Sequence, residues 1–276
     1  MNYQITKSGI IIKDTSDFNI EHILECGQIF TYKKLDVNKY EVYSKDNFAL
    51  VEQTDSICTI NTTNPEYFVD FFDLKTDYSH IKQKLSTNAN LTNAINYGNG
   101  IRILKQDLLE VIIGFIISAN NNIERIKGIM ARLRQFGQNY GHYYSFPTLT
   151  ELSKITEEQF KQIGAGYRAK YLVKVIEQLG SVNFDETYKM KTPKLRDWLL
   201  SLCGVGPKVA DCILLFGYMR GDSFPVDTWI EKVYIDMFKK NKSRQEMSKD
   251  FINYFGELSG YAQQYLFYYK RNFEKQ

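Results

Sequence analysis

The sequence lacks the residue groupings that usually hold a metal ion. Its four cysteines are far apart and form neither a CxxC pair nor a close set of four, which argues against zinc and iron–sulfur sites. Its three histidines fall outside any HxE or HExxH arrangement, which argues against a metal-activated water. We therefore expect no metal site, and a chemistry carried by other side chains.

Long apolar runs, a secretory leader and a strong net charge are missing too. The most apolar run, 108–117, is interrupted by Glu110 and bounded by Lys105 and Asp107, so it predicts a buried helix rather than a membrane span. The first residues lack the basic-then-apolar order of a signal peptide, so we expect an intracellular protein of the cytoplasm or nucleoid, without membrane contact. The net charge of +3 is only mildly basic, so any binding to nucleic acid has to rest on local clusters.

What is present divides into a strand-like part and a helical part. Residues 40–42 and 48–50 alternate in the manner of strands on either side of 45–47, which predicts a β-hairpin. Further along the chain the apolar spacing becomes helical. We predict an α+β fold, with an N-terminal antiparallel β-rich domain over 1–99 that contributes to a binding pocket, and an all-α domain over 100–276.

The helical part carries its own start and stop signals. Residues 148–151 and 156–159 both match the capping box, in which a hydroxyl and a side chain three residues later satisfy free amides. Residues 167–179 place apolar side chains on one face and are followed by Gly180, which predicts a helix that ends there.

The most informative stretch predicts two apolar helices joined by a tight turn, over about 195–218. Gly204 and Gly206 allow a positive φ and a close approach to a ligand, and Val205 between them can pack onto the core. Pro207 suits the first helical position, where a missing N–H costs nothing. The free amides of such a turn can hold a phosphate oxygen. This helix-hairpin-helix pattern indicates binding to a DNA backbone without reading of bases.

Lys208 raises this pattern from binding to catalysis. It lies in the first turn of the second helix, where the positive end of the helix dipole disfavours an ammonium and so favours a neutral, nucleophilic amine. The competing interpretation is a lysine that only contacts a phosphate.

Asp227 is the predicted partner of this amine. Pro225 fixes an extended approach, and Asp227 then stands where a helix would begin. An N-cap is the simpler interpretation, since aspartate is among the best caps. A capped carboxylate is also kept ionised, which is the form that stabilises an oxocarbenium-like sugar, so both roles can hold.

At these residues the sequence resembles the helix-hairpin-helix DNA glycosylase superfamily. Four segments resemble the 8-oxoguanine DNA glycosylase family in particular: GVGPKVADC at 204–212, PVDTW at 225–229, SANNNIERI at 118–126 and GYRA at 166–169. The resemblance, which runs from about Asp17 to Phe267, implies a base excision repair enzyme. It would flip 8-oxoguanine out of double-stranded DNA, preferably opposite cytosine, excise it through a Schiff base at Lys208, and cleave the strand by β-elimination as an AP lyase.

The resemblance also assigns residues that contact the DNA. Asn120 would fill the gap left by the flipped nucleotide, Arg125 and Arg168 would read the orphaned cytosine, and Tyr167 would act as a wedge beside it. Gly204, Val205 and Gly206 of the hairpin would hold the backbone. The simpler interpretations are a turn former for Asn120 and a rim aromatic for Tyr167.

A second group of residues would surround the base. The resemblance implies that the carbonyl of Gly27 accepts the N7–H that only the oxidised guanine carries, and that Gln263 binds the Watson–Crick edge. Phe267 and Cys212 would pack on the two faces of the base. Gln263 and Phe267 are four apart and so share a helix face, although a phenylalanine alone is more often part of a core.

Two positions depart from the family pattern. Animal members usually carry a histidine two residues after the aspartate, where this chain has Trp229, which leaves a phosphate contact there unsupported. Cys203 stands where proline is common, and the glycines of the hairpin remain. We expect a monomer that requires no cofactor, while the resemblance allows a monovalent or calcium ion on the hairpin carbonyls.

Three alternatives stay open at the level of sequence. The first is a related glycosylase with a different lesion choice. Relatives that act on oxidised pyrimidines or mispaired adenine commonly carry a four-cysteine cluster after the aspartate, and no cysteine follows Cys212. The second is a non-catalytic helix-hairpin-helix protein that binds damaged DNA, and the third is a protein-interaction scaffold.

Overall fold

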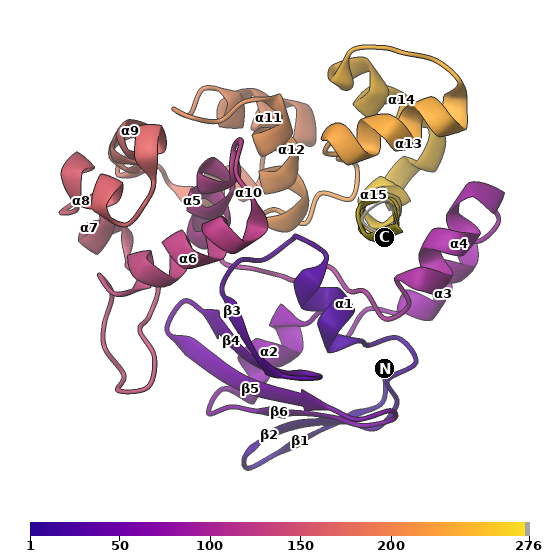
Figure 1. Ribbon diagram of the computed structural model, residues 1–276, viewed down its shortest axis with the longest axis horizontal. Coiled ribbons are helices and arrows are strands. Elements are labelled where there is room, and N and C mark those ends of the chain that lie inside the picture. Colours follow the sequence, from indigo (N-terminus) through magenta and orange to yellow (C-terminus); the bar gives the residue numbers. More distant parts are fainter. Residues whose placement is uncertain (274–276) are drawn as a thin grey trace.

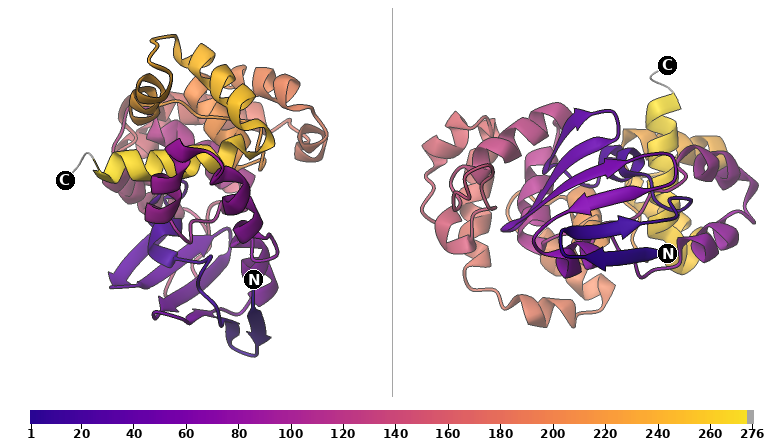
Figure 2. Two further views of the ribbon diagram at one scale, coloured as in Figure 1. Left: turned by 90° about the vertical axis from the view of Figure 1, so that its right-hand side faces the viewer. Right: turned by 90° about the horizontal axis from the view of Figure 1, so that it is seen from below.

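The computed structural model describes residues 1–273 and places a six-stranded antiparallel sheet beneath a layer of helices (Figure 1; Figure 2, left). The strands lie in the order β1-β2-β6-β5-β4-β3. This arrangement confirms the predicted α+β fold, with the sheet first and the helices after it. The strands are β1 Tyr3–Thr6, β2 Gly9–Ile12, β3 Tyr32–Asp36, β4 Lys39–Ser44, β5 Asn47–Gln53 and β6 Cys58–Asn61.

The predicted hairpin is formed by β4 and β5. Tyr40 pairs with Val51 and Val42 with Ala49, and the side chains of β4 alternate between buried and partly buried. Two residues make the turn, and Lys45 adopts a positive φ of 50° there. Such left-handed turns match the twist of the flanking strands, which explains why a two-residue loop suffices.

The buried face of the sheet packs against two short helices to form a first hydrophobic core. Ile10 and Ile12 of β2 lie in this core together with Phe68 and Phe71. The helical aromatic spacing after residue 64 therefore buries rings against the sheet, as an amphipathic helix does. The two helices are α1 Ile20–Glu25 and α2 Pro65–Phe71.

A second core surrounds α5 (Leu108–Ser118). Nine residues of this helix are buried, and one of the nine is a glycine. The prediction of a buried helix over 108–117 is confirmed. No helix within residues 1–273 has the length and apolarity needed to cross a membrane. The other helices of this part are α6 Ile123–Arg134, α7 Leu149–Leu152, α8 Glu157–Gln162, α9 Ala169–Leu179, α10 Phe184–Tyr188, α11 Thr192–Leu200 and α12 Pro207–Phe216.

A third core joins two helices that precede residue 99 to three helices from the last fifty residues of the chain. Leu91 of α4 and Phe251 of α14 are both fully buried in it, and Cys26 lies there as well. The division of the chain at residue 99 stays a prediction, because helices from both sides of it share this core. Its helices are α3 Tyr78–Leu85, α4 Ala89–Tyr97, α13 Thr228–Phe238, α14 Arg244–Phe255 and α15 Ser259–Phe273.

The local helix signals are confirmed. Thr148 and Thr156 each form a complete capping box with the side chain three residues later. The helix predicted over 167–179 begins as a short 3-10 turn, continues as α9 and ends at Gly180. These signals act through hydrogen bonds between residues a few positions apart, so they can be predicted from the sequence without knowledge of the rest of the fold.

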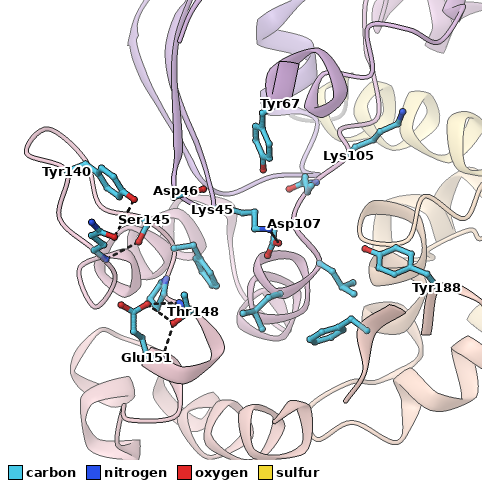
Figure 3. Close-up of a pocket in the computed structure, with 17 residues that line it drawn as sticks. Lys45, Asp46, Tyr67, Lys105, Asp107, Tyr140, Ser145, Thr148, Glu151 and Tyr188 are labelled. Carbon is cyan, nitrogen blue, oxygen red and sulfur yellow. Dashed lines mark hydrogen bonds and ion pairs between the residues drawn. The ribbon is translucent and has the colours of Figure 1, made fainter. Parts of the chain in front are cut away.

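A buried ion pair fixes the sheet to the helical layer. Glu110 of α5 lies 3.2 Å from the guanidinium of Arg134, and each side chain is only 6% exposed. Both also bind the β4–β5 turn, because Glu110 accepts the amide of Lys45 at 2.6 Å and Arg134 donates to the Lys45 carbonyl at 3.1 Å. Figure 3 looks into a cavity of about 790 Å³ beside this contact, where Lys45 extends toward Asp107, 3.5 Å away.

We predict that Glu110→Gln lowers the free energy of unfolding by about 3 kcal/mol, because it leaves the Arg134 guanidinium buried without a counter-charge. Glu186→Gln is the control, since its 2.6 Å pair with Lys189 is exposed on both sides, and such pairs contribute about 0.5 kcal/mol or less. Urea denaturation measures both changes. Equal midpoints for the two variants would contradict the structural role given to Glu110.

Candidate active site

The turn between α11 and α12 forms the predicted hairpin. Gly204 has a φ of +83°, and a β-carbon added there would lie 2.9 Å from the Tyr171 side chain. Val205 is 7% exposed and packs into the second core. Gly206 is exposed and occupies the N-cap of α12, where it offers no side-chain cap to the first amides of the helix. Those amides are therefore free to meet an anion.

Lys208 is the second residue of α12, after Pro207 at its start. Its side chain is half-buried, and the amine lies 5.4 Å from the centre of the Phe115 ring. Cys212 lies one turn further along α12, and burial raises the pKa of its thiol to about 11 although the nearby Lys208 charge opposes the shift. Cys212 therefore stays a neutral thiol near neutral pH. The amine therefore lies near an aromatic ring and a neutral thiol.

Asp227 is the N-cap of α13. Its Oδ1 accepts the amides of Trp229 and Ile230, both at 3.0 Å. The cap uses only this oxygen, so Oδ2 is left for another partner. The predicted cap is present, and it holds the carboxylate in place at the positive end of a helix dipole.

A small cavity of about 50 Å³ joins the two predicted catalytic residues to the four predicted base-contacting residues. They come from the loop after α1, from α12, from the start of α13 and from α15. Segments far apart in the sequence thus meet at one place. Its lining residues are Cys26, Gly27, Phe115, Lys208, Cys212, Phe216, Pro225, Asp227, Gln263, Gln264 and Phe267.

Gly27 has to be a glycine at this place. Its φ is +84°, and a β-carbon would lie 3.0 Å from the Phe267 ring and 3.2 Å from Nη1 of Arg271. Two hydrogen bonds hold the loop around it. Gln264, 1% exposed, donates to the Cys26 carbonyl at 2.7 Å, and Gln106 donates to the Gln28 carbonyl at 2.8 Å. The loop is therefore fixed from the C-terminal helix and from the segment before α5.

Gln264 and Arg271 are not among the site residues predicted from the sequence. Gln264 stands beside the predicted Gln263, and Arg271 follows Phe267 by four residues, so helical spacing was a signal for the second of them. Neither burial nor the contact with the Gly27 loop can be read from that spacing. Both residues act through partners more than 200 positions away in the chain.

The predicted DNA-contacting residues gather around the turn after α5. Asn120 is exposed and adopts a positive φ of 51°. Tyr167 is 51% exposed, and its hydroxyl donates to the Ala119 carbonyl at 3.2 Å. Arg125 is exposed in the first turn of α6, and its guanidinium lies 3.4 Å from the Gly164 carbonyl. These three side chains are placed at the surface, outside the lining of the small cavity.

Arg168 differs from the other residues of this group because it is buried, with 3% of its surface exposed. Its guanidinium donates to the carbonyls of Ala119 and Asn120, the latter at 2.7 Å. In this state Arg168 braces the turn that presents Asn120. To reach a base it would have to give up these bonds, and its reading role stays a prediction.

The comparisons with known proteins agree with this geometry. A family model described as the 8-oxoguanine DNA glycosylase N-terminal domain matches residues 10–112, and one described as the HhH-GPD superfamily base excision DNA repair protein matches residues 113–255. The N-glycosylase/DNA lyase of Arabidopsis thaliana is 28% identical, over 87% of this chain and 74% of the relative. That of Saccharomyces cerevisiae is 29% identical, over 84% and 71%.

A solved structure is similar over nearly the whole length. The Clostridium acetobutylicum 8-oxoguanine glycosylase/lyase, in complex with double-stranded DNA containing cytosine opposite to 8-oxoG, superimposes with a TM-score of 0.93. It is 34% identical to this chain, and the match covers 99% of each.

We predict that the structural and chemical roles of Asp227 separate by substitution. Asp227→Ala removes the cap and should lower the free energy of unfolding by about 1 kcal/mol, whereas Asp227→Asn keeps a capping oxygen and should change it by less than about 0.5 kcal/mol. Chemical denaturation of both variants measures the difference. A loss as large for asparagine as for alanine would show that the charge, and not the cap, stabilises α13.

Proposed function

Because this chain belongs to the 8-oxoguanine DNA glycosylase family of the HhH-GPD superfamily, we propose that Lys208 is the amine that excises the base and Asp227 its carboxylate partner. The protein is a base excision repair glycosylase with AP lyase activity, and its substrate is double-stranded DNA containing 8-oxoguanine. The observation that carries the assignment is the shared cavity, in which both residues meet the four groups expected around the base.

Excision and strand cleavage follow from one nucleophile. The neutral amine of Lys208 forms a bond to C1′ of the deoxyribose, and the base leaves with the electrons of the glycosidic bond and takes up a proton. The sugar ring then opens at the C1′–O4′ bond to give a Schiff base. Loss of a proton from C2′ expels the 3′ phosphate by β-elimination, and water releases the lysine.

Asp227 acts by charge and position. Positive charge develops on the sugar as the glycosidic bond breaks, and an ionised carboxylate beside it stabilises that charge. The cap supports this role, because Oδ1 is held by two amides at 3.0 Å while Oδ2 is not used by the cap.

The base is recognised by its edges and its faces. The carbonyl of Gly27 accepts the N7–H of the oxidised base, whereas normal guanine presents an acceptor there and is rejected. Gln263 binds the Watson–Crick edge. Phe267 and the neutral thiol of Cys212 pack on the two faces. The burial of Gln263 and Cys212 in the cavity supports these roles.

The base has to leave the stack before it reaches this cavity. Asn120 enters the gap that it leaves, Tyr167 wedges beside it, and Arg125 reads the orphaned cytosine, assisted by Arg168 once that side chain is released. The exposure of Asn120, Arg125 and Tyr167 around one turn supports a common contact with the duplex.

The hairpin holds the phosphate backbone through the free amides around 204–206. A monovalent or calcium ion on its carbonyls fits the donor set, because the turn residues 201–206 carry no carboxylate and offer carbonyl oxygens, which suit such ions better than transition metals. Such an ion would supply positive charge near a phosphate. Excision itself rests on an amine and a carboxylate and requires no cofactor. One chain supplies every residue that lines the cavity, so the proposed site needs no partner subunit, and the proposal is of an intracellular protein that acts as a monomer.

We predict that borohydride traps a covalent complex between the protein and a duplex containing 8-oxoguanine, because it reduces the Schiff base to a stable amine. Lys208→Gln should abolish the adduct and slow excision by roughly a thousandfold or more, while binding to the duplex persists. Gel electrophoresis measures the adduct, and Lys154→Gln, at an exposed lysine, is the control.

The same experiment separates the alternatives. A non-catalytic protein that binds damaged DNA gives no adduct with either form. A glycosylase with another lesion choice gives an adduct only with a different base. Turnover that survives in Lys208→Gln would remove this lysine as the nucleophile.

Arg125→Ala should relax the preference for cytosine opposite the lesion, because a good contact to a base edge is worth about 1–3 kcal/mol of discrimination. Excision rates on duplexes with each of the four opposite bases measure the preference. Arg244→Ala is the control, since that guanidinium pairs with Glu231 at 2.9 Å on the surface of α14. A preference that is the same in both variants would take Arg125 out of the reading role.

A further inference from the structure

Three residues of α15 form a stripe that faces the Gly27 loop. Gln263, Phe267 and Arg271 are spaced by four, so they lie one above another on the helix. Gln263 is 5% exposed and Arg271 is 7% exposed, although both carry polar groups. Phe267, between them, lines the base cavity.

Each of the two polar side chains keeps one buried atom without a partner among the described residues. These atoms are Oε1 of Gln263, an acceptor, and Nη1 of Arg271, a donor. The other nitrogens of Arg271 are engaged, because Nη2 donates to the Glu25 carbonyl and Nε to Asn272 at 3.3 Å. A buried polar group without a partner carries a free-energy cost in the folded protein. Such a cost is offset if a ligand supplies the missing partner.

Nη1 of Arg271 lies behind two residues that line the base cavity, Gly27 and Phe267, and is not itself part of the lining. It would be 3.2 Å from a β-carbon on Gly27, and the Phe267 ring would be 3.0 Å from the same point. The guanidinium stacks on that ring, with its carbon 5.1 Å from the ring centre. Gly27, Phe267 and Nη1 therefore meet at one point.

The cavity has to enlarge before it can hold a base. Its volume is about 50 Å³, whereas benzene alone occupies cavities of about 150 Å³. The Phe267 ring now lies against Gly27, so its movement away from Gly27 makes room for the base. The space that it leaves adjoins Nη1 of Arg271.

We propose that Arg271 is a further specificity-determining residue, and that its Nη1 donates a hydrogen bond to the C8 carbonyl oxygen of the flipped base. The inference rests on the proposed function. If the Gly27 carbonyl accepts N7–H, the neighbouring ring atom, C8, also lies at the Gly27 loop, where Nη1 has no partner. Normal guanine carries a C–H at that position and leaves Nη1 unsatisfied.

The spacing along α15 fits a base that satisfies both unpartnered atoms. Gln263 and Arg271 are about 12 Å apart along the helix axis, at 1.5 Å per residue, and both side chains reach inward. Oε1 of Gln263 needs a donor, which the Watson–Crick edge of guanine supplies. Nη1 of Arg271 needs an acceptor, which the C8 carbonyl supplies at the opposite end of the base.

The test measures binding in the Lys208→Gln protein, which does not turn over. Affinities are determined for three duplexes that carry 8-oxoguanine, guanine or a tetrahydrofuran abasic analogue at the same position. Arg271→Met should reduce the preference for 8-oxoguanine over guanine by roughly ten- to a hundredfold, the worth of a hydrogen bond from a charged donor. Its affinity for the abasic duplex should equal that of the parent, because no base is present to contact Nη1.

Lys270→Met is the matched control, since it removes the neighbouring cation of α15, which pairs with Asp236 at 2.8 Å, and should keep the parent's preference. Arg271→Lys retains a cationic donor on a shorter reach and should give an intermediate preference. Melting curves show whether each variant is folded. If Arg271→Met is not folded, the preference of Arg271→Lys for 8-oxoguanine over guanine is the test. A preference in Arg271→Lys equal to that of the parent then overturns the proposal.

The outcomes separate the proposal from its premise. An unchanged preference in Arg271→Met, or an equal loss for all three duplexes, overturns the role in reading C8 and leaves Arg271 as a brace for the Glu25 carbonyl and the Phe267 ring. A parent protein without any preference for 8-oxoguanine overturns the proposed function instead.

Discussion

The hydrogen bond from Gln264 to the carbonyl of Cys26, 2.7 Å long between residues 238 apart in sequence, closes the base cavity. It ties the loop that presents Gly27 to the last helix, and Arg271 adds a second tie to the Glu25 carbonyl. The first bond is buried and the second is partly buried, so water competes less with them than it does at the surface. The position of the Gly27 carbonyl, and with it the proposed recognition of the base, depends on contacts between the two ends of the chain.

The amino-terminal ends of α12 and α13 carry the two predicted catalytic residues, and at α13 the same residue also caps the helix. Lys208 lies in the first turn of α12 and Asp227 caps α13, so both predicted catalytic residues stand at the positive end of a helix dipole. Oδ1 of Asp227 caps the helix, and Oδ2 stays outside the cap, available for the proposed contact with the sugar. Arg168 illustrates the opposite arrangement, because its donors serve the turn of Asn120 and are not free for a base.

Two buried polar atoms beside the cavity lower the stability of the free protein, because neither has a hydrogen-bond partner within residues 1–273. Oε1 of Gln263 and Nη1 of Arg271 are buried without partners in the part of the chain that the structure describes, and Phe267 occupies the space between them. Such groups destabilise the fold until a ligand pairs with them. A base that lacks the matching donor and acceptor would leave the cost in place, so under the proposed role of Arg271 these two atoms would contribute to selectivity as well as to affinity.

Elements whose causes are local could be predicted from the order of the residues. The caps at Thr148, Thr156 and Asp227, the hairpin around Gly204 and the β4–β5 turn depend on hydrogen bonds and backbone angles within a few residues, and the motif spacing placed Lys208. Tertiary structure alone decided the burial of Arg168, the tie from Gln264, the contact of Arg271 with Gly27 and the small size of the cavity. Those features arise where segments more than 40 residues apart meet. The separation of two such segments along the chain does not tell how far apart they lie in the folded protein.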